Sequence, residues 1–197
     1  MNEYKVVGID LAKHVFQVCA LNRAGKVVFN KKLSREKVAL FIQQLPKSDI
    51  AMEACGSANY WARMFERMGH RVRLLPAQYV KPFVKRQKND ANDALAICEA
   101  ALRPDIHAVP IKTLEQQDMQ MMHRIRQRHV KNKTAIVNQI RAFLREYGII
   151  IPETLNQFRI RVAFVLEEQD NGLSIRARQL LHELFQEFQQ QQASIQA

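Results

Sequence analysis

The sequence predicts an α/β domain with a mixed β-sheet, followed by a region of long helices. Over the first hundred residues, short apolar runs alternate with helix-forming segments. Two of these apolar runs end in an acid, Asp10 and Glu53. From 113 to 147 no Pro or Gly occurs, and apolar residues recur at helical spacing. We therefore expect two domains, 1–110 and 111–197.

The first domain is predicted to begin with three consecutive strands. The run from Val6 to Ile9 is apolar on both faces, as in a central strand. A second strand is expected from 15 to 21. Turn residues at 22–25 then lead into a third strand over 26–29. These strands form a meander, and Asp10 lies at the end of its first strand.

Helices and strands alternate in the rest of this domain. Ser34 can cap a helix that runs to about Gln44. Further elements are a strand over 49–52, a helix over 58–68, a strand over 71–75 and a helix over 91–102. This order is that of the RNase H-like fold. Another small α/β domain with a mixed sheet is the alternative. The acids favour the RNase H-like fold, because sites form at the strand ends of open sheets.

The second domain is predicted to consist of two or three long helices. A capping box at 113–116 begins the first, and Gly148 ends it. Pro152 could start another helix, and Ser174 could cap a last one that frays at 189–192. Their apolar seams suggest either an antiparallel hairpin or an intermolecular coiled coil.

The charge of the chain suggests a polyanionic partner. The formal net charge is +11, although charge alone also fits a merely basic protein. A basic stretch with interleaved Tyr79 and Phe83 runs directly into Asp90. It could follow a phosphate backbone, or it could be a solvated face with both aromatics in the core. The predicted nucleic-acid contacts are Lys81, Lys85, Arg86 and Lys88 in this stretch, and Arg124, Arg128, Lys131 and Arg141 on the long helix. For the helix, a solvated face is again the other interpretation.

Four acids form the candidate catalytic and metal site: Asp10, Glu53, Asp90 and Asp93. Asp90 and Asp93 share a helix face, with Cβ atoms about 5–6 Å apart. Asp10 and Glu53 end strands that could be neighbours. If the four converge, divalent cations would relieve their repulsion, Mg²⁺ before Mn²⁺, and could assist phosphoryl transfer. Each acid alone is explained as a helix-start, turn or solvent-facing residue, but their joint placement favours a site.

The cysteines and the hydropathy predict a cytoplasmic protein. The three cysteines fit neither a zinc spacing nor a disulfide framework, and we expect buried free thiols. The N-terminus lacks a signal-peptide pattern. No apolar run approaches the roughly 20 residues of a membrane span.

Several motifs together resemble the DEDD transposases of bacterial insertion sequences, RuvC-like recombinases guided by a bridge RNA. The motifs are Val7-Gly-Ile-Asp-Leu-Ala-Lys13, Met52-Glu-Ala-Cys-Gly-Ser57, Tyr60-Trp-Ala-Arg63, Val80-Lys-Pro-Phe-Val-Lys-Arg-Gln-Lys-Asn-Asp90, Asn92-Asp-Ala94 and Asn138-Gln-Ile-Arg141. The resemblance implies a RuvC-like domain whose four acids bind Mg²⁺ or Mn²⁺. It also implies a coiled-coil region that joins subunits into a dimer or tetramer and grips DNA and a structured guide RNA, in the bacterial cytoplasm near the nucleoid.

In that family a separate C-terminal domain carries a serine nucleophile. The sequence ends at Ala197, before such a domain, so we assign no nucleophile and expect no full strand exchange by this chain alone. Two alternatives remain: a stand-alone nuclease of the Holliday-junction type, and a non-catalytic nucleic-acid binder.

Overall fold

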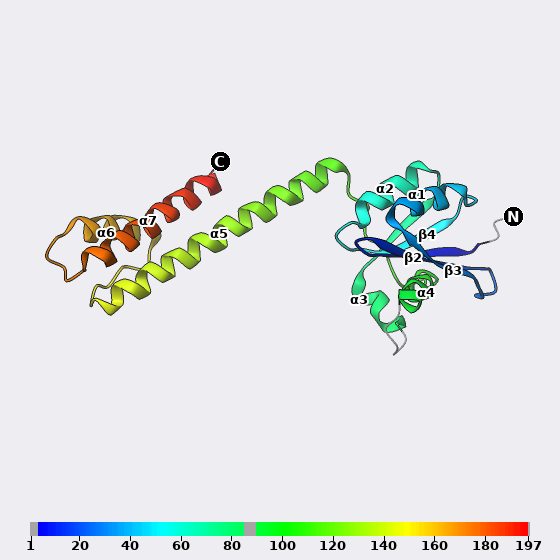
Figure 1. The fold of residues 1–197 in the computed structure, drawn as a ribbon, viewed down its shortest axis with the longest axis horizontal. Coiled ribbons are helices and arrows are strands. Elements are labelled where there is room, and N and C mark those ends of the chain that lie inside the picture. Colours follow the sequence, from blue (N-terminus) through cyan, green and yellow to red (C-terminus); the bar gives the residue numbers. More distant parts are fainter. Residues whose placement is uncertain (1–3, 85–89, 197) are drawn as a thin grey trace. The chain divides into compact units, whose positions relative to one another are not determined.

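A computed structural model of the chain describes residues 4–84 and 90–196. It contains two compact units, 1–113 and 114–197, and each is described by itself. The first unit is an α/β domain and the second is helical (Figure 1).

A five-stranded mixed sheet forms the centre of the first unit, in the order β3-β2-β1-β4-β5. The strands are β1 (Val6–Leu11), β2 (Val15–Leu21), β3 (Val27–Ser34), β4 (Asp49–Glu53) and β5 (Arg71–Leu75). The first three strands pair antiparallel, while β4 pairs in parallel with both β1 and β5. The predicted fold class, an RNase H-like mixed sheet followed by long helices, is confirmed.

Helices cover both faces of this sheet (Figure 1). They are α1 (Arg35–Gln44), α2 (Ala58–Arg67), α3 (Ala77–Val80), the 3₁₀ helix η1 (Lys81–Phe83) and α4 (Asp90–Ala101). Helices α1 and α2 pack on one face around large side chains, where the rings of Phe16 and Trp61 meet edge to face at 5.0 Å. Trp61 is thus part of this core, whereas its neighbour Tyr60 is 46% exposed.

The opposite face is covered by α4, and its core combines small residues with Leu21, Leu75 and Ile97. Its buried side chains include Cys19 and Ala51 from the strands, and Ala94 and Cys98 from the helix. A Cβ added to Gly8 would lie 2.5 Å from the Cys98 Sγ and 2.6 Å from the Ala94 carbonyl oxygen. The absence of a side chain at Gly8 therefore lets α4 approach β1 closely.

Three local predictions differ from the structure. Strand β3 continues to Ser34 instead of ending at Phe29, because its polar residues stay paired with β2 at the sheet edge. The short elements α3 and η1 lie between the predicted strand over 71–75 and the predicted helix over 91–102, where no element is expected. The last helix does not fray at 189–192.

The second unit contains α5 (Leu114–Glu146), α6 (Leu155–Glu167) and α7 (Ile175–Gln196). Helix α6 begins after Thr154, not at Pro152. The C-terminal half of α5 lies beside α7 (Figure 1). The core of this unit gathers around Ile140, Phe158 and Phe188, which are fully buried. Gly148, at φ 74°, ends α5 as predicted.

None of the helices in the described ranges is long and apolar enough to cross a membrane. The three cysteines are free, with Cys19 and Cys98 buried as expected and Cys55 half-buried.

Candidate active site

The alternation of β1 and β4 directs two of the predicted acids to the same face of the sheet. In β1, Val7 and Ile9 belong to the core beneath α1 and α2. Asp10 is one residue out of phase with them and therefore faces α4. In β4, Met52 belongs to that same core, so Glu53 also faces α4.

The register of the two strands also makes these acids neighbours. Strands β1 and β4 pair in parallel, with Ile9 beside Met52. One step further along this register lie Asp10 and Glu53, on strands about 4.8 Å apart. The prediction that the two acids end neighbouring strands is confirmed by the sheet topology.

Helix α4 brings a third acid to the same place. Asp93 lies in its first turn, and Asp10, Glu53 and Asp93 line one pocket of about 320 Å³. Asp90 is the first residue of the helix, as predicted, but its side chain lies outside the described part of the structure. Three acids from three elements thus meet in one pocket.

The other walls of the pocket combine polar and apolar groups. Gln78 and Lys81 come from the unpredicted α3 and η1, and Lys81 brings a positive charge to the carboxylates. Val80, Val84 and Ile97 supply apolar surface. Among the described lining residues, a phosphate group entering this pocket would meet one cation beside three acids.

The donor chemistry of the pocket suits a hard divalent cation, because the residues described in its lining offer carboxylate oxygens and no thiol or imidazole. Among the side chains that the structure describes, however, no three acids, histidines or cysteines are grouped closely enough to hold a metal ion as they stand. The fourth predicted ligand, Asp90, is not among those side chains.

Behind the acids lies a pair of amide side chains that sequence reasoning missed. Gln17 in β2 is buried, and its Nε2 donates to the Oδ1 of Asn30 in β3 at 2.6 Å. Asn30 Nδ2 in turn donates to the carbonyl of Ala91 in α4 at 2.9 Å. A polar residue in the middle of the apolar segment 15–21 was the signal that could have revealed this contact.

The predicted nucleic-acid contacts lie in different surroundings. Lys81 is exposed at the acidic pocket, and Arg124, Arg128 and Lys131 are exposed on α5. Lys85, Arg86 and Lys88 lie outside the described residues. Arg141 is instead engaged within the second unit, where its Nη2 donates to the carbonyls of Pro152 at 2.7 Å and Glu153 at 2.6 Å.

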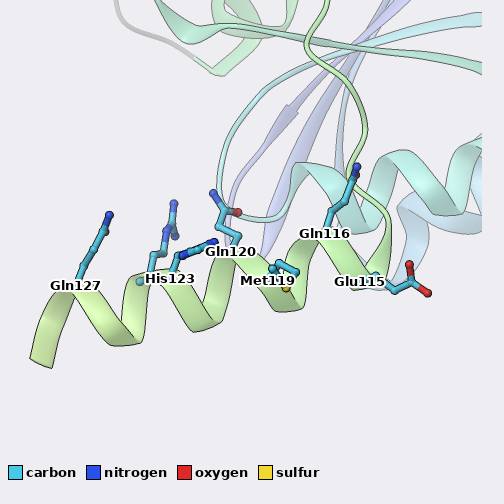
Figure 2. A pocket seen from close by; sticks show the side chains of 7 residues that line it. Glu115, Gln116, Met119, Gln120, His123 and Gln127 are labelled. Atoms are coloured by element: carbon cyan, nitrogen blue, oxygen red, sulfur yellow. The ribbon is translucent and has the colours of Figure 1, made fainter. Parts of the chain in front are cut away.

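Helix α5 carries a second concave surface. Figure 2 shows the side chains of Gln116, Gln120 and Gln127 extending from the same side of the helix. Every residue that lines this surface, Met119 and His123 included, comes from α5 itself. Since the described residues that line it all come from one helix, we assign no site there.

Carboxylates gathered at the strand ends of an RNase H-like sheet define a class of candidate nucleic-acid enzymes. Residues 7–149 match the family model of the IS110-type DEDD transposases, which is described as a transposase. The chain belongs to this family.

Three curated relatives support the match. The chain is 53% identical to a "Probable family 20 transposase" of Pseudomonas aeruginosa over 144 residues, covering 73% of this chain and 43% of the relative. It is 41% identical to the transposase for insertion sequence element IS1111A of Coxiella burnetii, over 95% of this chain and 51% of the relative. It is 39% identical to the transposase for insertion sequence element IS1328 of Yersinia enterocolitica, over 86% of this chain and 51% of the relative. The chain therefore spans about half the length of the relatives that it matches.

Proposed function

We propose that the first unit provides the acidic, Mg²⁺-dependent site with which an insertion-sequence transposase cleaves and exchanges DNA strands. The observation that carries this proposal is the meeting of Asp10, Glu53 and Asp93 in one pocket. Membership of a transposase family supports the choice of reaction.

In this proposal the carboxylates hold Mg²⁺ or Mn²⁺, with Asp90 as the fourth ligand. The bound ion would supply Lewis-acid activation of a phosphate. Lys81 would bind a non-bridging phosphate oxygen, because it lines the same pocket and is exposed. The apolar wall formed by Val84 and Ile97 would exclude water from one side of that phosphate.

The proposed partners are DNA and a structured guide RNA. The exposed cations Arg124, Arg128 and Lys131 would bind their phosphates along α5. Arg141 is assigned a structural role in addition, because its guanidinium already holds two carbonyls.

We also propose that a second copy of the chain covers the exposed apolar side chains of α5, giving a dimer or tetramer. Met119, Met122 and Ile125 are between 46% and 64% exposed and recur at helical spacing. Apolar residues at such spacing form the contact between the helices of a coiled coil.

A metal titration tests the acidic site. We expect Mn²⁺ to bind the parent chain, and Asp10→Asn and Asp93→Asn each to weaken this binding at least about tenfold, because loss of even an outer partner of a metal site costs 10–100-fold. Asp105→Asn, which removes an exposed acid away from the pocket, serves as the control and should bind like the parent. Equal affinity in all four proteins would contradict the metal site.

A non-catalytic binding role is the second candidate. The observation in its favour is that the three described acids do not form a ready metal site. It predicts an affinity for DNA or RNA that is unchanged by Asp10→Asn and Asp93→Asn. Neutralising Lys85, Arg86 and Lys88 should then weaken binding and reduce the salt dependence, by about 0.9 in log–log slope for each lost phosphate contact.

A further inference from the structure

A pair of amide side chains beside the acidic pocket, buried Gln17 and half-buried Asn30, connects the sheet to the helix that carries Asp93. Gln17 lies directly opposite Asp10 in the antiparallel register of β1 and β2. Directly opposed residues share a face of the sheet, with Cβ atoms about 4.5–5.5 Å apart. Gln17 is therefore a neighbour of Asp10 on the face covered by α4, and only 7% of its surface is exposed.

The second amide extends this connection to the helix. Asn30 accepts from Gln17 at 2.6 Å and donates to the carbonyl of Ala91 at 2.9 Å. Ala91 lies in the first turn of α4, two residues before Asp93. Two hydrogen bonds thus lead from the neighbour of Asp10 to the turn that presents Asp93.

The two hydrogen bonds can fix the position of α4 along the sheet, which apolar packing alone defines less sharply. Gly8 and the apolar side chains under α4 determine how closely the helix approaches the sheet, but van der Waals contacts have little directional preference. A hydrogen bond requires a defined distance and angle, and therefore sets the position along the sheet. Two turns further on, the Cys98 Sγ contacts the carbonyl of Cys19 at 3.3 Å on the same side of the helix.

We propose that Gln17 and Asn30 are positioning residues that hold the first turn of α4 in register with β1, so that Asp93 stays beside Asp10. This inference rests on the function proposed above, since its consequence is expressed at the acidic site. Neither residue is a ligand in this account; both act through the placement of α4.

The test compares Asn30→Leu and Gln17→Leu with Asn59→Leu in the full chain. Asn59 is a matched control because it is also a half-buried amide bonded to backbone, accepting from the Lys112 N–H at 2.8 Å, on the side of the sheet away from the pocket. We measure two quantities: hydrogen exchange of the α4 amides from Asp93 to Ala96, and Mn²⁺ affinity well below the unfolding temperature.

We expect Asn30→Leu to accelerate exchange of these amides about tenfold relative to Asn59→Leu, and to weaken Mn²⁺ binding by 10–100-fold, as loss of an orienting partner commonly does. Gln17→Leu should act in the same direction. Asn59→Leu should show neither effect even where its loss of overall stability is similar. If Asn30→Leu fails to fold, Asn30→Ser, which puts a shorter hydroxyl group in place of the amide, replaces it and should show smaller changes of the same sign.

The outcomes separate the two proposals. If hydrogen exchange of the α4 amides were unchanged, the anchoring of α4 would be overturned, whatever the Mn²⁺ affinity of the variants. Faster exchange with parental Mn²⁺ affinity would overturn the positioning role and leave the acidic site standing. A parent chain that does not bind Mn²⁺ would overturn the proposed metal site itself, together with the positioning role derived from it.

Discussion

Replacing Gly8 by Ala tests the close approach of α4 to β1. The added methyl group would lie 2.5 Å from the Cys98 Sγ and 2.6 Å from the Ala94 carbonyl oxygen. Favourable non-bonded contacts between carbon atoms are about 3.5–4.0 Å. The helix would therefore have to move away from the strand by about 1 Å, or the strand would have to bend.

The cost should lie at the upper end of the range for overpacking, about 3 kcal/mol. Two of the three nearest atoms belong to the backbone of α4, at Ala94 and Cys98, and cannot rotate out of the way. For a domain of about a hundred residues, this cost corresponds to a fall in unfolding temperature of about 12 °C or more. Shortening the neighbour in a Gly8→Ala/Cys98→Ala double variant should recover less than half of the loss, since the contact with the Ala94 oxygen remains.

Fluorescence of Trp61 provides the assay. It is the single tryptophan of the chain and is buried in the first unit, so its signal reports the unfolding of that unit. Gly56→Ala is the control, because a Cβ at that glycine would meet nothing within 4 Å. Its effect should stay within about 0.5 kcal/mol. If Gly8→Ala proved as stable as Gly56→Ala, the close contact between α4 and β1 would be refuted.

Two further variants test other parts of the fold. Burial lowers the pKa of His70, whose Nδ1 accepts from the Ser48 N–H, so protonation favours the unfolded chain. Stability of the first unit should be full above about pH 6.5 and fall as the pH drops from there through the lowered pKa, and His70→Gln should lose this dependence in urea titrations at several pH values. In the second unit, Arg178 donates to two carbonyls at the end of α6 and to the Asn171 Oδ1. Arg178→Lys keeps the charge but not the planar fork, and should cost about 1.5–3 kcal/mol by circular dichroism, while exposed Arg176→Lys should be neutral.

Much of the fold could be predicted because the periodicity of the sequence is strong. The apolar segment 15–21 became β2 with the predicted ends, and the stretch without Pro or Gly became α5. The end of β3 was missed because Lys31 and Lys32 look like loop residues. Charged side chains are nevertheless common on edge strands, and β3 is one. The short helix after Pro76 was missed because a single turn has no periodicity to detect.

The candidate site could be predicted only as far as strand alternation and helix starts allow. These rules place Asp10, Glu53 and Asp93 on one face, where the structure brings them together. The amide pair could not be predicted, because it depends on which residues of β2 and β3 lie opposite each other. The internal hydrogen bonds of Arg141 depend on how α5 meets the loop before α6, and a count of charges does not contain that information.

The acids of the pocket are contributed by segments far apart along the chain: the first strand, the fourth strand and the fourth helix of the domain. A ribosome must therefore release nearly the whole first unit before these carboxylates can meet. A nascent or proteolysed fragment that lacks α4 would expose Asp10 and Glu53 without their third partner. Any metal-dependent activity of this unit would then require that its folding is complete.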